Sequence, residues 1–297
     1  MSGTRNALII RAVKLVRYGP AGRERPGLID GDGRVRDLSR HIEDLRGEAL
    51  APETLARLGR LEISRLPLVP EGARLGVPVA GVSKIVAVGL NYSDHAAEAG
   101  MPVPPEPVLF MKATSAISGP YDPVVIPLGS EKTDWEVELG VVIGERSQHL
   151  SPEKALDSVA GYTIVNDVSE RAFQLEHGGQ WVKGKSADTF APIGPWLVTR
   201  DEVSDPQALG LWLEVNGHRF QNGNTRAMVY GVAYLVSYIS RFMTLLPGDV
   251  LSTGTPPGVG MGRKPPVFLK PGDVMRLGID GLGEQRLEVV AYGVSHE

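Results

Sequence analysis

Two acidic side chains interrupt an otherwise apolar run, Trp135-Glu136-Val137-Glu138-Leu139-Gly140, which follows Asp134. In a strand, Glu136 and Glu138 project from the same face, and their side chains start about 7 Å apart. From that separation both carboxylates can converge on one hard cation, because Mg²⁺ and similar ions prefer oxygen ligands. The same spacing also fits two glutamates on the solvated face of a half-buried strand. The pair alone leaves both interpretations open.

A third carboxylate follows a second apolar segment. Residues 160–166 have the composition of a strand, and Asp167 comes directly after them. Three carboxylates from two strands would leave positions on an octahedral Mg²⁺ or Mn²⁺ open for substrate oxygens. The alternative is that Asp167 caps a helix that begins near Ser169, which would require no metal.

A histidine and a glutamate share one face of a short predicted helix. His95 and Glu98 are three residues apart between a Ser93-Asp94 start and a Gly100 stop. A carboxylate that accepts one imidazole N–H fixes the tautomer and makes the other nitrogen a better general base toward water. The alternative is an exposed helix pair that contributes little energy.

One motif is misleading. Residues 179–186 match the G-x-x-x-x-G-K-[ST] pattern of a phosphate-binding loop. No buried strand precedes the motif, and Pro192 interrupts the following residues before a helix could receive a phosphate, so we reject nucleotide binding there. Lys185 remains a candidate for stabilising an oxyanion next to a metal. An isolated lysine is more often a surface residue.

A Gly- and Pro-rich loop at residues 252–262 follows a short apolar strand. Such a loop can present backbone N–H groups and the Thr255 hydroxyl to a substrate carboxylate. A purely structural turn needs the same residue types, so this assignment also stays open.

The elements that must position these residues are mostly strands. Glycine and proline punctuate short β-branched runs, which predict strands at 8–15, 84–89, 136–143, 161–167, 194–199, 211–216 and 274–279. Helical spacing favours fewer elements, at 52–65, 93–99 and 225–244. The Pro- and Gly-rich residues 66–78 lack periodicity and predict a domain boundary, with a small domain at 1–78 and a catalytic domain at 79–297.

Composition narrows the class of protein. The chain has 297 residues, with 31 Lys and Arg against 35 Asp and Glu, and a net charge of −4, which argues against nucleic acid as a partner. It has no cysteine, so any metal must be held by oxygen or nitrogen ligands. No apolar run is long enough to cross a bilayer or to form a signal-peptide core, and we expect a cytoplasmic protein.

Taken in order, these motifs resemble the fumarylacetoacetate hydrolase superfamily. The residues that carry the resemblance are Asn91-Tyr92-Ser93-Asp94-His95-x-x-Glu98, Pro107 to Lys112, Glu136-Val137-Glu138, Asn166-Asp167-x-x-x-Arg171, Lys183-Gly184-Lys185 and Thr253-Gly254-Thr255-Pro256. The resemblance is strong from about residue 80 onward. It implies a β-rich α+β fold, a mixed β-sandwich or roll with a small N-terminal domain, in a homodimer or a dimer of dimers.

The resemblance also implies roles for single residues. Glu136, Glu138 and Asp167 would hold Mg²⁺ or Mn²⁺, and His95 with Glu98 would activate water. Arg171, Gln174 and Lys185 would orient that water or stabilise the negative charge that develops. Lys112, Thr255 and Tyr92 would contact the substrate. Longer animal hydrolases carry a fourth acidic ligand ahead of the histidine, where this chain has Asn91 and Tyr92.

The implied reaction is hydrolysis of the C3–C4 bond of a 2,4-dioxo acid to pyruvate and a second acid. Over its full length the chain is similar to bacterial hydrolases of 2,4-diketo-3-deoxy sugar acids, with L-rhamnonate and L-fuconate derivatives as the expected substrates. Relatives with the same metal site act as acylpyruvate hydrolases, as decarboxylases of oxaloacetate-like acids or as isomerases. A scaffold protein that has lost its activity is the non-enzymatic alternative.

Overall fold

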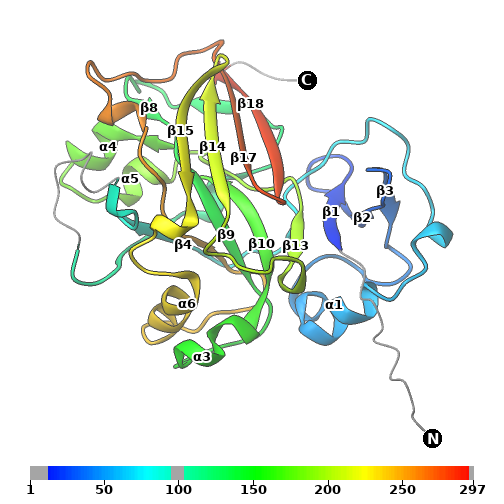
Figure 1. Ribbon diagram of the computed structural model, residues 1–297. Helices are drawn as coiled ribbons and strands as arrows, with labels where there is room; N and C mark the ends of the chain where they lie inside the picture. The colour runs from blue at the N-terminus through cyan, green and yellow to red at the C-terminus, as the bar shows by residue number, and fades with distance from the viewer. Residues whose placement is uncertain (1–12, 95–103, 294–297) are drawn as a thin grey trace, which may run out of the picture.

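Two long strands that are buried on both faces lie at the centre of the protein. The computed structural model describes residues 13–94 and 104–293 (Figure 1). Every residue of β9 (Val137–Ile143) and β10 (Val159–Asn166) is buried. Continuous apolar runs of this kind are typical of strands that are covered on both sides. The two strands are antiparallel, and Val137 lies opposite Asn166.

These strands belong to a mixed sheet of nine strands in the order β3-β2-β1-β13-β10-β9-β16-β4-β5. Only β16 and β4 pair in parallel within this sheet, among the strands that the structure describes. The bounds of the other seven strands are β1 Lys14–Tyr18, β2 Arg25–Ile29, β3 Val35–Asp37, β4 Ile85–Gly89, β5 Val108–Lys112, β13 Leu197–Thr199 and β16 Val250–Ser252.

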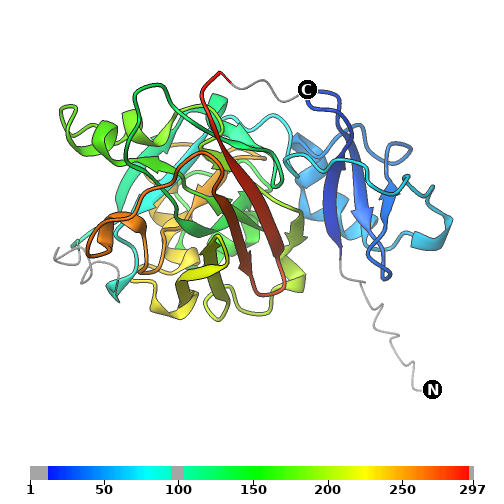
Figure 2. The same cartoon turned by 90° about the horizontal axis from the view of Figure 1, so that it is seen from above.

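A second sheet covers one face of the first. It has the order β15-β14-β17-β18-β7, and its strands are β7 Val124–Ile126, β14 Gly210–Val215, β15 His218–Asn224, β17 Val274–Ile279 and β18 Gly283–Ala291. Buried residues alternate with more exposed ones in β14, so this sheet has one inward face. The inward face packs on β9 and β10. Figures 1 and 2 show β14, β17 and β18 lying across these central strands.

Helices are short and lie around the sandwich. Two of them, α3 (Pro152–Ala155) and α6 (Val232–Ser240), pack on each other (Figure 1). The remaining helices are α1 Pro52–Leu58, α4 Arg171–Leu175, α5 Val182–Lys185, and the 3₁₀ turns η1 Gly47–Leu50, η2 Ile63–Arg65, η3 Thr114–Ala116, η4 Leu156–Ser158, η5 Arg200–Glu202, η6 Thr225–Ala227 and η7 Gly260–Gly262. Two small sheets pair β11 (Ser169–Glu170) with β8 (Thr133–Asp134) and β12 (Ala191–Pro192) with β6 (Ile117–Ser118). In the described ranges no helix has the length and apolarity to span a membrane.

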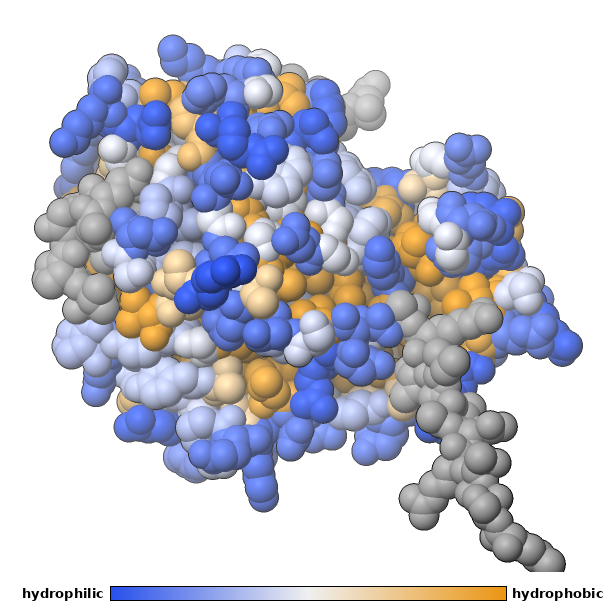
Figure 3. All heavy atoms as spheres, viewed as in Figure 1, coloured by the Kyte–Doolittle hydropathy of each residue, from blue (hydrophilic) through white to orange (hydrophobic). Residues whose placement is uncertain are grey.

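The N-terminal residues form a lobe beside the sandwich, yet their strands continue its sheet. β1 pairs with β13 through Lys14–Val198 and Leu15–Leu197, and one cluster of buried apolar side chains includes residues from both parts. Apolar residues also gather at the junction between lobe and body in the space-filling view (Figure 3). The predicted domain boundary after residue 78 stays a prediction.

The β-rich fold class is confirmed, while several element bounds differ from the expected ones. The strand predicted at 8–15 is described only from Lys14, and residues 1–12 lie outside the described ranges. The helices predicted at 52–65 and 225–244 are shorter, because each breaks into a 3₁₀ turn and one α-helix. Of the helix predicted at 93–99, only Ser93 and Asp94 are described.

Candidate active site

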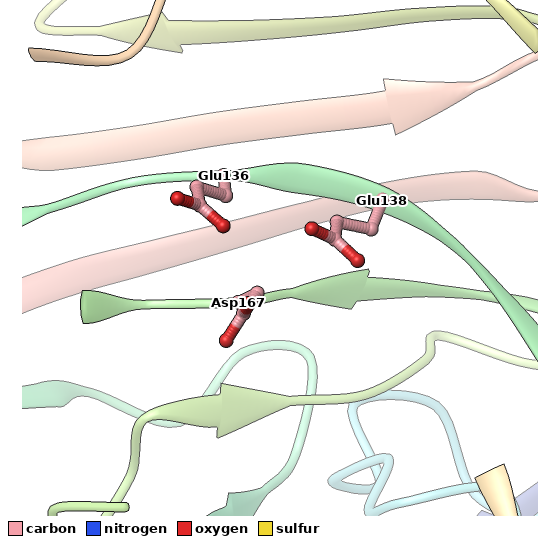
Figure 4. Close-up of side chains that lie close together, drawn as sticks. All are labelled: Glu136, Glu138 and Asp167. Atoms are coloured by element: carbon pink, nitrogen blue, oxygen red, sulfur yellow. The ribbon is translucent and has the colours of Figure 1, made fainter. Parts of the chain in front are cut away.

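Three carboxylates meet where β9 begins and β10 ends. The antiparallel pairing places Glu136, which precedes β9, beside Asp167, which follows β10, and the Asp167 amide donates to the Glu136 carbonyl at 2.9 Å. Glu136, Glu138 and Asp167 each offer an oxygen within 4.8 Å of the other two. Their side chains lie close together at neighbouring strand ends (Figure 4). The three residues are 6%, 1% and 0% exposed, so the alternative of a solvated strand face is wrong.

Asp167 is also not the cap of the helix that follows it. The helix α4 begins at Arg171, and the Glu170 carboxylate accepts the Ala172 amide at 2.9 Å. Glu170 therefore takes the capping role that side-chain oxygens play at helix starts. Asp167 is left to face the other two carboxylates.

Two buried lysines hold the carboxylates. Lys185 Nζ donates to Glu136 Oε2 at 2.8 Å and to Asp167 Oδ2 at 2.6 Å. Lys112 Nζ donates to Asp167 Oδ1 at 2.5 Å and to the Val168 carbonyl at 3.0 Å. Burial on its own lowers the pKa of both lysines; in Lys185 the attraction of Asp167 and Glu136 outweighs burial and raises the pKa, whereas in Lys112 burial dominates and the pKa is lowered.

The glycine of the Lys183-Gly184-Lys185 run allows α5 to approach α4 closely. A Cβ at Gly184 would lie 2.6 Å from the Gln174 amide nitrogen, which is closer than real contacts allow. Only glycine therefore fits between the helices and brings Lys185 to the carboxylates. This packing role accounts for the glycine in the loop-like motif that we rejected as a nucleotide site.

An arginine links the carboxylates to a fourth acid that the sequence analysis did not select. Arg171 Nε donates to Asp134 Oδ2 at 2.8 Å, and Arg171 Nη2 lies 2.7 Å from Glu136 Oε1. Arg171 Nη1 also donates to Gln174 Oε1 at 3.1 Å. Asp134 precedes Glu136 by two residues, the same spacing that separates Glu136 from Glu138. This spacing was the signal that could have identified Asp134 as part of the site.

Glu138 differs from the other two carboxylates because its donors are neutral. The Ser252 hydroxyl and the Gly254 amide donate to Glu138 Oε2 at 2.6 and 2.8 Å, and within the described ranges these bonds leave Oε1 without a donor. Gly254 has a φ of +97°, a conformation that favours glycine and aims its amide at the carboxylate. Burial, followed by repulsion from Asp167 and Glu136, raises the pKa of Glu138 well above its usual value.

The cluster has the composition of a divalent-cation site. Its acids are Asp134, Glu136, Glu138 and Asp167, and its cations are Lys112, Arg171 and Lys185, so the acids exceed the cations by one charge. This excess adds to the effect of burial, which is the larger cause of the raised pKa of Glu138. Three convergent hard oxygens fit Mg²⁺ or Mn²⁺, and Glu136, Glu138 and Asp167 are the residues that could hold the ion.

A pocket of about 570 Å³ opens onto the carboxylates. Its walls include the apolar side chains of Phe110, Trp181, Val259 and Met261, and Arg263 and Lys264 also line it. The Phe110 and Trp181 rings meet edge to face with centroids 5.3 Å apart, and Lys185 Nζ lies 5.0 Å from the Phe110 centroid. Access to the acidic cluster is therefore through a largely apolar passage.

The structure brings most of the predicted site residues to this pocket. Those that line it are Glu136, Glu138, Arg171, Gln174, Lys185 and Thr255. The Thr255 hydroxyl already donates to the Val137 carbonyl and accepts from Gln221 Nε2, at 2.9 and 2.8 Å. His95 and Glu98 lie outside the described residues. The roles predicted for the residues that line the pocket, and for His95 and Glu98, stay predictions.

Two residues predicted to contact the substrate lie behind the pocket wall. Lys112 has no exposed side-chain surface and binds Asp167, so its position favours holding that carboxylate over touching substrate. Tyr92 is fully buried, and its hydroxyl has no hydrogen-bond partner among the described residues. Burial, then the charges of Glu138 and Asp94, raise the pKa of Tyr92 well above its usual value.

The metal-free protein should lose stability as the pH rises. Because the pKa of Glu138 is higher in the folded chain than in the unfolded chain, the folded chain binds the extra proton between the two values. This contribution is fully present below the unfolded pKa of about 4.3 and is lost progressively as the pH rises through the folded pKa. Melting temperatures in EDTA from pH 5 to 9 should fall more steeply for the wild type than for Glu138→Gln. Equal slopes for the two proteins would contradict this assignment.

Comparisons with known proteins agree with the geometry. Residues 84–290 match the family described as fumarylacetoacetate (FAA) hydrolase, C-terminal. A protein of Burkholderia ambifaria that carries only the general name of a hydrolase is 64% identical over 274 residues, which cover 92% of this chain and 97% of the relative.

Two solved structures share the fold over nearly their whole length. The fumarylacetoacetate hydrolase of Exiguobacterium antarcticum has a TM-score of 0.82 and 37% identity, and the match covers 94% of this chain and 99% of that one. The maleylpyruvate hydrolase of Sphingobium, solved with a manganese(II) ion and pyruvate, has a TM-score of 0.77 and 31% identity over the same shares of the two chains.

Proposed function

Because the chain belongs to the fumarylacetoacetate hydrolase superfamily, we propose that it is an Mg²⁺- or Mn²⁺-dependent hydrolase that cleaves the C3–C4 bond of a 2,4-dioxo acid and releases pyruvate. The observation that carries the proposal is the convergence of Glu136, Glu138 and Asp167, of which Glu136 and Glu138 line the pocket. The maleylpyruvate hydrolase that was solved with manganese and pyruvate supports both the metal and the product.

The metal supplies one part of the chemistry and the chain supplies the rest. When bound, the ion acts as a Lewis acid toward substrate oxygens. Lys185 and Arg171 present fixed positive charge beside the carboxylates, where negative charge develops as a C–C bond breaks. Preorganised donors of this kind stabilise an oxyanion without reorganisation.

The proposed hydrolysis adds the elements of one water molecule across the C3–C4 bond. The oxygen of water bonds to C4, and its proton passes to a general base, for which His95 supported by Glu98 is the candidate from the sequence. The C3–C4 bond then breaks, and its electron pair goes to the three-carbon fragment, which is the enolate of pyruvate. Protonation at C3 completes pyruvate, while C4 becomes the carboxylate of the second acid.

Metal removal provides the first test. The protein with Mg²⁺ or Mn²⁺ and a panel of 2,4-dioxo acids should release pyruvate, including the predicted derivatives of L-rhamnonate and L-fuconate. Dialysis against EDTA should remove more than about 95% of the activity, and either ion should restore it, because the proposed cleavage needs a Lewis acid at the carboxylates. Full turnover in EDTA would refute the metal-dependent mechanism.

A decarboxylase would use the same carboxylates without activated water. His95→Ala should abolish hydrolysis of the dioxo acid, while any decarboxylation of oxaloacetate by the wild type should survive in the variant. If the wild type acts only on oxaloacetate and His95→Ala has no effect, the protein is a decarboxylase instead. The same comparison shows whether His95 has the role predicted for it.

A further inference from the structure

Asp134 is a buried carboxylate that joins two parts of the pocket. Its side chain is 0% exposed, and its hydrogen bonds come from N–H groups on both oxygens. Oδ1 accepts the amides of Trp135 and Gly260 at 2.8 and 2.7 Å. Oδ2 accepts the Met261 amide at 3.0 Å and Arg171 Nε at 2.8 Å, and Arg171 Nη2 also lies 2.8 Å away. This set of donors matches an ionised carboxylate, because both of its oxygens are acceptors.

On one side, the donor to Asp134 is the guanidinium of Arg171. This arginine lines the pocket; its Nη2 lies 2.7 Å from Glu136 Oε1, and its Nη1 donates to Gln174 Oε1 at 3.1 Å. Because a guanidinium is planar, contacts at Nε and Nη2 set the orientation of the whole group. Asp134 therefore determines where Arg171 presents its charge to the pocket.

On the other side, the donors belong to the turn η7, which carries part of the pocket wall. Val259 and Met261 line the pocket on either side of Gly260. A Cβ at Gly260 would lie 2.0 Å from the Val267 carbonyl oxygen and 2.7 Å from Asp134 Oδ1, so only glycine allows this approach. The Gly260 carbonyl accepts the Val267 amide at 3.0 Å, which closes the turn. This part of the wall is thus packed directly on the carboxylate that holds Arg171.

We propose that Asp134 is a positioning residue that couples charge stabilisation to substrate fit. Buried behind the residues that line the pocket, it acts through two neighbours. One is the Arg171 guanidinium, which faces the negative charge that develops, and the other is the wall at residues 259–261, against which the substrate fits. This inference rests on the proposed function for the reaction that takes place beside Arg171.

Replacement of Asp134 by asparagine tests the coupling with a side chain of nearly the same size. In either orientation the asparagine NH₂ group would face N–H donors, the two amides now at Oδ1 or the amide and guanidinium now at Oδ2. One side therefore loses its acceptor, and Arg171 loses a charged partner. With a 2,4-dioxo acid, Asp134→Asn should lower kcat about 10- to 100-fold through Arg171 and raise KM about three- to tenfold through the wall.

Asp249→Asn is a matched structural control. Asp249 is also 0% exposed and pairs with Lys84. It accepts the Ser83 hydroxyl at 2.5 Å and the Leu246 amide at 2.7 Å, and none of these residues lines the pocket. Both variants should lower the melting temperature, whereas Asp249→Asn should leave kcat and KM within about twofold of the wild type. Equal losses of activity in the two variants would overturn the positioning role.

Arg171→Lys shows whether Asp134 affects kcat through the guanidinium. Lysine keeps the charge but lacks the planar group that Asp134 orients. Adding Asp134→Asn to Arg171→Lys should therefore change kcat by less than about threefold, while it still raises KM through the wall. If the two substitutions instead lowered kcat by the product of their separate effects, the coupling would be wrong.

A signal that does not depend on turnover separates this inference from the proposed reaction. The NMR signal of the Arg171 Nε–H, identified by its loss in Arg171→Lys, should exchange with water at least about 100-fold more slowly than the signals of exposed arginines. Asp134→Asn should abolish this protection, and Asp249→Asn should not. Fast exchange in the wild type would overturn the proposal even if Asp134→Asn does not fold.

The remaining outcomes distinguish the two claims. If the protected signal depends on Asp134 while no 2,4-dioxo acid releases pyruvate, the positioning of Arg171 stands and the proposed reaction fails. If dioxo acids are cleaved by Asp134→Asn with the kcat and KM of the wild type, the reaction stands and the positioning role fails.

Discussion

Replacing Glu138 with glutamine should lower pyruvate release by about 10³-fold or more and abolish divalent-cation binding. Glu138 is the carboxylate whose hydrogen bonds come only from the neutral Ser252 hydroxyl and Gly254 amide, so among the described donors no cation competes for it. The amide of glutamine keeps the shape and can still accept both bonds, but it removes the charge that a hard cation needs. Calorimetry with Mn²⁺ and steady-state rates measure the two losses.

The stability of the same variant provides the decisive control. Since ionising Glu138 is unfavourable in the metal-free fold, Glu138→Gln should melt in EDTA at the wild-type temperature or above it at pH 8. Loss of activity is then not loss of structure. Glu288→Gln changes an exposed carboxylate, 60% accessible and paired with Arg286, and should alter neither property. Wild-type Mn²⁺ affinity in Glu138→Gln would contradict the assignment of this residue as a ligand.

Replacing Lys185 with methionine should lower both the stability of the protein and kcat. Added metal should restore only the stability. In the metal-free protein, Glu136 and Asp167 would lose a shared buried partner, which costs on the order of 3 kcal/mol of unfolding free energy. A divalent cation can offset the same carboxylates, so Mg²⁺ should restore much of the stability. It cannot replace the ammonium donors beside the reacting group, and kcat should stay about 10²-fold low.

Lys183 offers a matched control on the same helix. Its side chain is exposed and donates to the His177 carbonyl at 2.7 Å. Lys183→Met should leave kcat and the melting temperature in Mg²⁺ near their wild-type values. If Lys185→Met turned over at the wild-type rate once Mg²⁺ had restored its stability, Lys185 would be a structural counter-charge with no part in the reaction.

The sequence was most informative where chemistry and local periodicity agree. Glu136 and Glu138 are two residues apart in an apolar run that favours a strand, so a shared face was the expected geometry. Asp167 ends the next long apolar run, and the antiparallel pairing of β9 with β10 brought it to them. These two observations favoured a hard-cation site, and the burial of the three carboxylates then excluded the solvated strand face. The β-rich class followed in the same way from the spacing of glycine and proline.

The sequence could not reveal features that depend on how distant segments pack. Lys112 lies on a strand at the sheet edge, and nothing local shows that it binds Asp167, 55 residues away. Asp134 holds Arg171 and the turn at Gly260–Gly262 only because residues 260 and 261 fold back onto it. The short α6 shows the same limit, since a helical pattern over 225–244 does not show where tertiary contacts end it.

The pairing of β1 with β13 has a consequence for how the molecule can be divided. The portion that matches the family begins at residue 84, yet cutting there would strip β13 of its neighbour and leave its N–H and C=O groups open along that flank. Unpaired strand edges recruit other chains. A protein shortened to this portion would therefore be expected to self-associate through the exposed edge of β13, because β1 covers that edge in the full chain.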